Sequence, residues 1–232
     1  KTGKLPEENG KPIFEKYTMT ELALNTEKLF DKVCSLNCIK SYTLVGGTAL
    51  AIQIENRQSE DLDFMSWKSN KKQKQEVDWA GIEKELKEIG IIESREIFDL
   101  DHVEFVVAGV KLSFYASNKF SPVEIPVHVK GNLFLADILA IGAMKMEVLM
   151  RRSNFRDYYD IYSILKTGIN IKSIVQLATK YSGHLLSTKN LLAMLVDSKR
   201  FHVDSGFQLL QPIYNITPIQ IEEYLKILIK QH

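Results

Sequence analysis

Asp61-Leu62-Asp63-Phe64 places two carboxylates two residues apart in a short apolar segment. In a β-strand, side chains at positions i and i+2 point to the same face, with Cα atoms about 6.5–7 Å apart. Burying two like charges side by side is costly unless a cation is shared between them. Magnesium binds a few carboxylate oxygens and completes its shell with water and phosphate oxygens. The pair therefore suggests a divalent-metal site, although an isolated pair of this kind is more often a solvated strand end or a helix cap.

The residues upstream of this pair favour the metal-site interpretation. Residues 41–45 (SYTLV) are typical of a strand, and residues 49–54 (ALAIQI) have helical character. Gly46, Gly47 and Thr48 join the two. Such a junction presents backbone N–H groups at the positive end of a helix, and glycine lets a triphosphate approach closely.

Three blocks of the chain resemble the AbiEii/AbiGii toxin branch of the DNA polymerase β-type nucleotidyltransferase superfamily. The first block consists of residues 45–50 (VGGTAL) and 57–64 (RQSEDLDF). The second is residues 136–146 (ADILAIGAMKM), similar to the branch's helix that carries a lysine, and the third is residues 155–162 (FRDYYDIY). The blocks occur in the family's order, which is far more specific than any single match.

The resemblance implies metal-dependent transfer of a nucleoside monophosphate from an NTP to an acceptor hydroxyl, with Mg²⁺ or Mn²⁺ as the metal. It also implies a toxin of a toxin–antitoxin or abortive-infection system, with RNA, in particular tRNA, as acceptor and an antitoxin protein as partner. The residues that match the family's motifs are Asp61 and Asp63 as metal ligands; Asp61, Asp63, Lys145 and Asp157 as catalytic residues; and Gly46, Gly47, Thr48, Arg57 and Lys145 as nucleotide-binding residues.

Several points stay open in the sequence. Ser113 stands where many superfamily members carry a third acid, so either Glu104 supplies a ligand or two aspartates suffice. Asp157 and Asp160 share one helix face, and the resemblance favours Asp157 as the functional one, with the other capping the helix or pairing with an arginine such as Arg152 or Arg156. The alternatives to an RNA-modifying enzyme are a catalytically silent nucleotide-binding module and a transferase acting on protein or a small molecule.

The pattern predicts an α+β protein: a mixed-sheet nucleotidyltransferase core with flanking helices, followed by a helical C-terminal half. We expect residues 1–12 to be disordered, residues 13–128 to form the core, and residues 129–232 to complete the active-site cleft. The expected helices cover residues 19–38, 76–89, 133–150, 155–166, 171–182, 188–198 and 218–231, and the expected strands after the acidic one cover residues 91–98, 102–107 and 110–115.

The formal net charge is only +1, from 30 Lys and Arg against 29 Asp and Glu. A nucleic-acid partner would therefore be held by a local patch rather than by the field of the whole protein. Lys68, Lys71, Lys72 and Lys74 form one such cluster, although lysine runs are more often solvated loops. No stretch reaches the roughly 18–20 apolar residues that span a bilayer, so we expect a cytoplasmic protein without a membrane partner.

Overall fold

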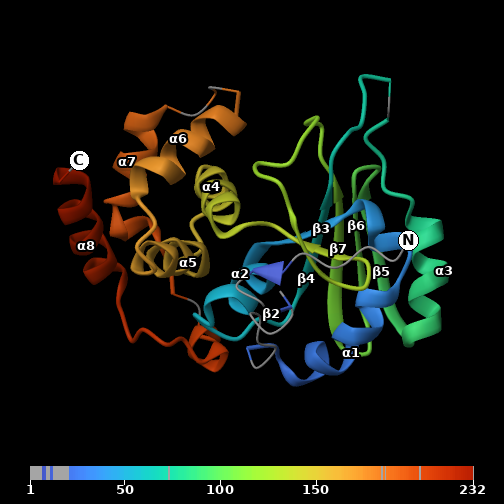
Figure 1. Ribbon diagram of the computed structural model, residues 1–232. Helices are drawn as coiled ribbons and strands as arrows, with labels where there is room; N and C mark the ends of the chain where they lie inside the picture. The colour runs from blue at the N-terminus through green and yellow to red at the C-terminus, as the bar shows by residue number, and fades with distance from the viewer. Residues whose placement is uncertain are drawn as a thin grey trace. The chain divides into compact units, whose positions relative to one another are not determined.

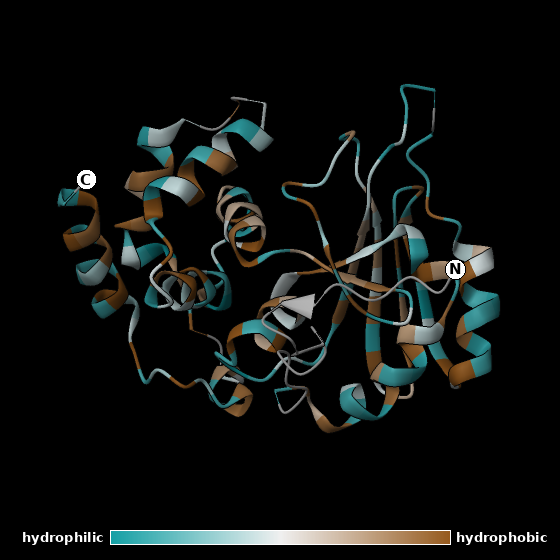
Figure 2. Ribbon diagram, in the orientation of Figure 1, coloured by the Kyte–Doolittle hydropathy of each residue, from teal (hydrophilic) through white to brown (hydrophobic). Residues whose placement is uncertain are grey.

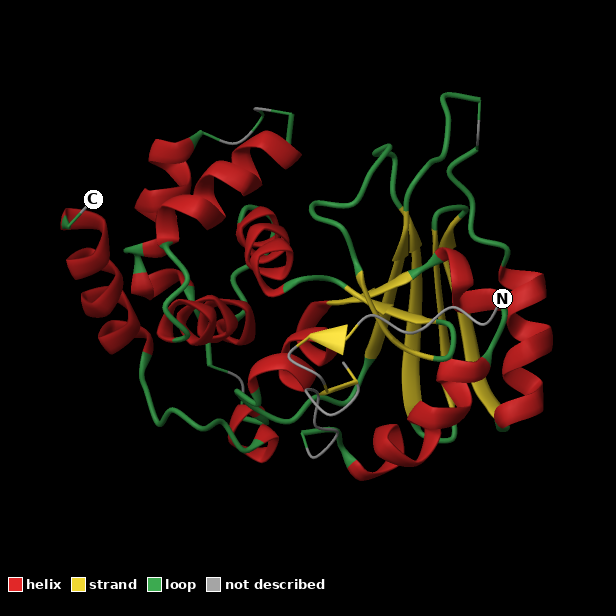
Figure 3. Ribbon diagram, viewed as in Figure 1, coloured by secondary structure: helices red, strands yellow, loops and turns green. Residues whose placement is uncertain are grey.

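The computed structural model describes residues 7–8, 11–12, 21–72, 74–183, 185, 187–203 and 205–231. The chain forms two compact units. The first, the sheet unit, comprises Lys1–Glu55 and Ser59–Ala136, and the second, the helical unit, comprises Asn56–Gln58 and Asp137–His232. Figure 3 distinguishes the strands of the sheet unit, in yellow, from the helices of both units, in red.

Seven strands of the sheet unit form one mixed sheet in the order β5-β6-β7-β4-β3-β9-β8 (Figure 1). β4 is parallel to β7 and β3 is parallel to β9, whereas the other neighbours are antiparallel. With its flanking helices this sheet confirms the predicted α+β class. The strands are β3 Thr43–Val45, β4 Leu62–Ser66, β5 Ile92–Asp99, β6 His102–Val107, β7 Val110–Ala116, β8 Val127–Lys130 and β9 Leu133–Leu135.

The central strand β4 has one buried face and one partly exposed face. Leu62 and Phe64 are fully buried, whereas Asp63 between them is half-buried. Phe64 stacks on Phe114 of β7 with ring centroids 5.2 Å apart, and burying a side chain of this size contributes about 1.5–3 kcal/mol. Because strand side chains alternate, this packing fixes Asp63 on the opposite face of the sheet.

The three strands predicted between residues 91 and 115 are confirmed to within one residue at each end. The turn between β6 and β7 consists of Ala108 and Gly109, with φ angles of 50° and 74°. A two-residue hairpin turn with both φ angles positive matches the right-handed twist of the strands that it joins. This turn geometry accounts for the tight connection between β6 and β7.

The prediction of a helix starting at residue 133 was wrong. Leu133–Leu135 forms β9, in which Leu135 lies opposite Leu44 of β3. The apolar residues of β9 are followed closely by the apolar residues of the next helix. A strand of three residues is too short to show an alternating pattern, so the sequence could not distinguish it from the start of that helix. The helix itself begins after Asp137, whose side chain accepts a hydrogen bond from the Leu139 N–H at 2.8 Å.

The helices of the sheet unit follow from local signals. Asp78 caps the start of α3 by accepting a hydrogen bond from the Gly81 N–H at 3.0 Å. Figure 2 shows hydrophilic and hydrophobic positions side by side on α3, as expected for a helix with one face on the core. α1 contacts both β7 and α3, and it covers less of the chain than the predicted range 19–38. The helices are α1 Leu24–Ser35, α2 Gly46–Ile54 and α3 Trp79–Ile89, with the 3₁₀ helix η2 Cys38–Ser41.

The helical unit packs α4 against both α5 and α6, and α5 against α8. Asn154, Asn170 and Thr217 cap three of its helices, and Thr217 forms a capping box with Gln220. Among the residues that the structure describes, no helix is both long and apolar enough to cross a membrane. The helices are α4 Ile138–Leu149, α5 Phe155–Lys166, α6 Ile171–Tyr181, α7 Thr188–Leu195 and α8 Pro218–Lys230, with 3₁₀ helices η3 Ser198–Arg200 and η4 Phe207–Leu210.

The predicted disordered segment, residues 1–12, lies largely outside the described residues. Within it, β1 (Glu7–Glu8) pairs with β2 (Lys11–Pro12) in antiparallel fashion.

Candidate active-site residues

Gly46, the first residue of α2, lies directly beside the side chain of Asp63. It has a φ of +74°, which side chains rarely adopt, and a Cβ built on it would lie 2.7 Å from Oδ2 of Asp63. Val45, which precedes it, is the register partner of Asp63 across β3 and β4. Only glycine combines this backbone angle with this close approach. The glycine predicted to admit a phosphate thus lies directly beside a predicted metal ligand.

Thr48 uses its side chain to hold the turn that leads into β4. It is buried, and its hydroxyl lies 2.7 Å from the Ser59 hydroxyl and donates a hydrogen bond to the Asp61 carbonyl. The Thr26 hydroxyl donates to the next carbonyl upstream, that of Glu60, at 2.6 Å. These bonds position the backbone of Asp61, so Thr48 connects the glycine helix to the acidic pair.

Asp61 and Asp63 lie at the start of β4, two residues apart and both half-buried. Across the β4–β7 pair, Asp63 lies opposite Ser113. Lys111, two residues before Ser113, places its Nζ 3.3 Å from Oδ2 of Asp61. The pair of aspartates therefore shares its face of the sheet with a lysine that the sequence did not single out.

The position expected for a third acid is occupied by Ser113, in a row of neighbouring residues that crosses strands β4, β7 and β6. Ser113 is fully buried and lies opposite both Asp63 and Glu104. Its hydroxyl donates to Oε1 of Glu104 at 3.4 Å, and His102 Nε2 lies 3.2 Å from the same oxygen. In the part of the chain that the structure describes, no three His, Cys, Asp or Glu side chains group closely enough to hold a metal ion.

Two carboxylates at the edge of a partly exposed face fit a magnesium ion that keeps most of its waters. Such an ion needs only one or two protein carboxylates when substrate phosphates complete its shell. Asp61 is 43% exposed on its side chain, which leaves room for those ligands. The donor set of the sheet unit thus fits Mg²⁺ or Mn²⁺ delivered with a nucleotide, without a third acid.

The charges around Lys111 keep it protonated. Burial by itself would lower the pKa of Lys111, but the negative charges of Asp61, Glu104 and Asp63 outweigh that effect and raise the pKa above its ordinary value. The lysine is therefore a fixed positive charge beside the acidic pair at physiological pH.

In the helical unit, Lys145 of α4 lies between two carboxylates of α5. Its Nζ is 2.6 Å from Oδ1 of Asp157 and 2.8 Å from Oδ2 of Asp160. Lys145 is only 7% exposed, and both aspartates are buried almost completely. The i, i+3 spacing in α5 puts the two acids on the same helix face, where one ammonium can reach both.

Each aspartate also binds an arginine. Arg57 holds Asp160 with two hydrogen bonds, from Nε and Nη2, each of 2.9 Å, and its third nitrogen, Nη1, donates to the Gln58 carbonyl. Arg152 holds Asp157 in the same two-pronged way, at 2.7 and 3.0 Å. The expected pairing of Asp160 with Arg152 or Arg156 was therefore wrong: Arg152 binds Asp157, and the arginine that binds Asp160 is Arg57 of the Asn56–Gln58 segment.

These partners keep the buried groups ionised. Burial would raise the pKa of Asp160, but the positive charges of Arg57 and Lys145 hold that pKa far below its ordinary value. For Asp157, burial is likewise outweighed by the positive charges of Lys145 and Arg152, so that its pKa is lowered. The pKa of Lys145 is raised in turn, because Asp160 and Asp157 outweigh its burial. The cluster is a fully charged network at neutral pH.

The predicted site residues thus fall into two groups. Gly46, Gly47, Thr48, Asp61 and Asp63 are gathered at the β3–α2 junction and the start of β4 in the sheet unit. Arg57, Lys145 and Asp157 belong to the charged network of the helical unit. The structure adds Lys111, and it shows that Asp160 binds both Lys145 and Arg57. No sequence signal pointed to the Arg57–Asp160 pair, because its members are 103 residues apart.

Comparison with known proteins identifies the family. The family model described as "Nucleotidyl transferase AbiEii toxin, Type IV TA system" matches residues 37–201. The uncharacterized protein aq_aa25 of Aquifex aeolicus (strain VF5) is 27% identical over 167 residues, covering 70% of this chain and 76% of the relative.

Two solved structures from Helicobacter pylori have a similar fold. A proposed nucleotidyltransferase has a TM-score of 0.54 at 22% identity, covering 90% of this chain and 95% of that chain. JHP933 has a TM-score of 0.52 at 23% identity, covering 90% and 92%. The family match extends over well above half of the 232 residues, and the chain belongs to the nucleotidyltransferase AbiEii toxin family of type IV toxin–antitoxin systems.

Proposed function

We propose that this nucleotidyltransferase transfers a nucleoside monophosphate from an NTP to a hydroxyl group of RNA, and that the transfer depends on Mg²⁺ or Mn²⁺ held by Asp61 and Asp63. The family supports nucleotidyl transfer in a toxin–antitoxin context, which implies an NTP substrate and an antitoxin. The observation that carries the metal and nucleotide assignment is the close approach of Gly46 to Asp63, at 2.7 Å from the position of an added Cβ to Oδ2.

The residues of the sheet unit have separable tasks in this proposal. The backbone N–H groups of Gly46 and Gly47, at the start of α2, bind phosphate oxygens. The Thr48 hydroxyl holds the backbone of Asp61 in place. The carboxylates of Asp61 and Asp63 hold the divalent ion, which when bound neutralises charge on the triphosphate.

Lys145 and Asp157 are proposed as catalytic residues on the strength of the family motifs. The ion pairs of Lys145 with Asp157 and Asp160 support a charge role, because they keep the ammonium protonated and held at a fixed position. A fixed positive charge favours a reaction in which negative charge grows on a leaving pyrophosphate. Arg57 is proposed to act through Asp160, since all three of its guanidinium nitrogens are engaged within the helical unit.

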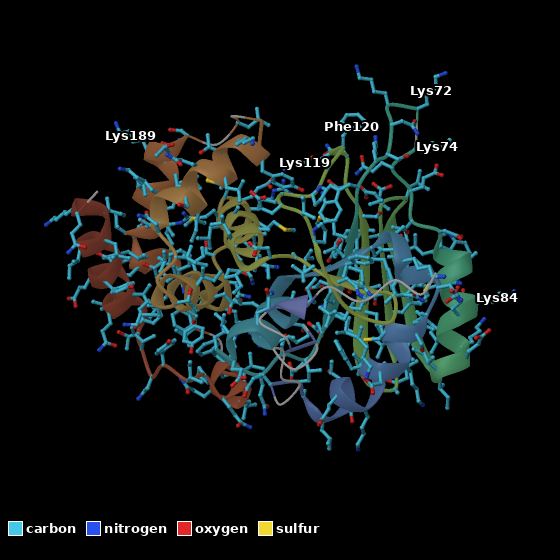
Figure 4. All side chains as sticks on the ribbon, viewed as in Figure 1. Lys72, Lys74, Lys84, Lys119, Phe120 and Lys189 are labelled. Atoms are coloured by element: carbon cyan, nitrogen blue, oxygen red, sulfur yellow. The ribbon has the colours of Figure 1, made fainter. Side chains whose placement is uncertain are left out.

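RNA is favoured as the acceptor by two loops of the sheet unit. The loop after β4 carries Lys68, Lys71, Lys72 and Lys74, and the loop after β7 carries Lys119 and an exposed Phe120 (Figure 4). The Lys68 N–H donates to the Lys119 carbonyl at 3.0 Å, which joins the loops. Lysines bind phosphates, and an exposed aromatic ring offers a stacking surface for an unpaired base.

The test is transfer of label from each α-³²P NTP to total cellular RNA in the presence of Mg²⁺. We expect labelled RNA with the wild type, no labelled RNA with Asp61→Asn/Asp63→Asn, and loss of the labelled band after RNase treatment. Asp99→Asn, which removes an exposed carboxylate at the end of the edge strand β5, serves as the matched control and is expected to label RNA normally. Label that resists RNase and yields to protease would contradict the RNA assignment and point to a protein acceptor.

A further inference from the structure

Lys111 is a positively charged residue on a strand of the sheet, next to the proposed metal ligands. It lies on β7, whose residues Leu112 and Ser113 are the register partners of Leu62 and Asp63 on β4. Strand alternation puts Lys111 and Ser113 on the face that carries Asp63, while Leu112 is buried on the other face. The position of the lysine is thus set by the sheet and not by a loop.

The ammonium of Lys111 already contacts one of the proposed ligand oxygens. Its Nζ lies 3.3 Å from Oδ2 of Asp61, and the two side chains are 39% and 43% exposed. Ion pairs between side chains this exposed are weak and exchange readily. Three carboxylates, those of Asp61, Asp63 and Glu104, act on this single cation. The cluster therefore retains an excess of negative charge even with the lysine in place.

A divalent cation held by Asp61 and Asp63 would compete with the Lys111 ammonium for the Asp61 carboxylate. The positive charge of the ion would also repel the ammonium and so weaken its ion pair with Asp61. The lysine cannot move far, because its stem is anchored on β7 beside β4. The triphosphate that accompanies the metal is then the nearest new anion, and an ammonium is a strong partner for phosphate oxygens.

We propose that Lys111 is a nucleotide-binding residue that exchanges between two partners: the Asp61 carboxylate in the nucleotide-free protein and the triphosphate of the bound NTP. The inference rests on the proposed metal and nucleotide site at Asp61 and Asp63. It assigns to this chain a triphosphate-binding side chain that lies on a core strand, two residues from the position where the third acid is replaced by Ser113.

The experiment compares Lys111→Met, which keeps the stem and removes the charge, with Lys84→Met, which removes the charge of an exposed lysine on α3 (Figure 4). Two binding constants are measured on the full chain: that for Mn²⁺ alone, by electron paramagnetic resonance, and that for non-hydrolysable α,β-methylene NTP analogues with Mn²⁺, by calorimetry. Asp61→Asn is measured alongside to establish that the metal binds at the proposed site.

We expect Lys111→Met to bind Mn²⁺ alone more tightly, since a competing cation is gone, and to bind the analogue about tenfold more weakly, equivalent to about 1.4 kcal/mol. Lys111→Arg should recover most of the analogue affinity, and Lys84→Met should match the wild type in both constants. If Asp61→Asn weakens metal binding but Lys111→Met leaves either constant within twofold of the wild type, the Lys111 inference is overturned and the proposed function stands. If Asp61→Asn leaves metal and analogue binding unchanged, both are overturned.

Discussion

The guanidinium of Arg57 holds the carboxylate of Asp160 with two parallel hydrogen bonds of 2.9 Å, although the two residues are 103 positions apart. Both side chains are almost fully buried, and Lys145 shares the same carboxylate at 2.8 Å. This pair makes the short Asn56–Gln58 segment part of the helical unit. It also determines how the proposed catalytic Lys145 is held.

Removing one member of this pair should destabilise the protein strongly. Arg57→Ala leaves Asp160 with a buried charge that Lys145 alone must balance, and breaking a buried ion pair in this way costs about 3–5 kcal/mol. Urea unfolding followed by circular dichroism measures the loss. The control is Arg151→Ala, whose side chain is 77% exposed and pairs with Glu147 one helical turn away, so that its removal should cost about 1 kcal/mol or less. Equal losses for the two variants would contradict the structural role given to the Arg57–Asp160 pair.

The same pair should make stability depend on acid pH. The pKa of Asp160 lies below its ordinary value of 3.8 in the folded protein, so the unfolded chain binds a proton first as the pH falls. The stabilisation is therefore complete above the unfolded pKa and is lost as the pH drops toward the folded one. We expect the difference in unfolding free energy between wild type and Asp160→Asn to be constant from about pH 6 to about pH 8, well above the ordinary carboxyl pKa of about 4, and to shrink below that pKa. A constant difference throughout the acid range would refute this assignment.

Sequence patterns predicted those parts of the fold that depend on neighbours in the chain. Strands β6 and β7 and helices α5, α6 and α8 arise from patterns among residues within a few positions of one another, and their predicted ranges agree with the structure to within one residue at each end. Strand β9 was not predicted, because three apolar residues are too few to show the alternating pattern of a strand. Its pairing with β3 depends on Leu44, which lies far upstream in the chain. The family motifs indicated Asp61, Asp63, Lys145 and Asp157, but the pairing of Lys111 with Asp61 and that of Arg57 with Asp160 follow from sheet register and helix packing, which a single sequence does not encode locally.

Gly46→Ala should impair nucleotide binding more than it impairs folding. The added methyl group would lie 2.7 Å from Oδ2 of Asp63, and the φ of +74° disfavours any side chain. Gly183→Ala is the matched control, since Gly183 has a φ of +68° with nothing within 4 Å of an added Cβ. Each change should cost about 1–2 kcal/mol of backbone strain, but only Gly46→Ala should reduce NTP affinity, measured by calorimetry. If the two variants bind NTP equally well, Gly46 has no special place in the site.

Charge reversal in the lysine loop should weaken RNA binding. Lys72→Glu/Lys74→Glu changes the loop after β4, whereas Lys84→Glu/Lys189→Glu alters net charge equally at two exposed lysines on α3 and α7 (Figure 4). Fluorescence anisotropy with labelled tRNA at several salt concentrations measures affinity. We expect the loop variant to bind more weakly, with a salt slope reduced by about 1 for each RNA phosphate that the protein no longer binds. An equal weakening in both variants would show that net charge, and not this loop, attracts RNA.

The release of pyrophosphate as a function of Mg²⁺ concentration tests the central claim most directly. Wild type, Asp61→Asn, Asp63→Asn and the control Asp99→Asn are each incubated with NTP and RNA while free pyrophosphate is measured. We predict release that rises and saturates with Mg²⁺ in the wild type and the control, and release at background in the other two variants at every Mg²⁺ concentration. Pyrophosphate release that is independent of Mg²⁺, or that persists in both aspartate variants while they remain folded, would contradict the assignment of Asp61 and Asp63 as the ligands of a catalytic metal.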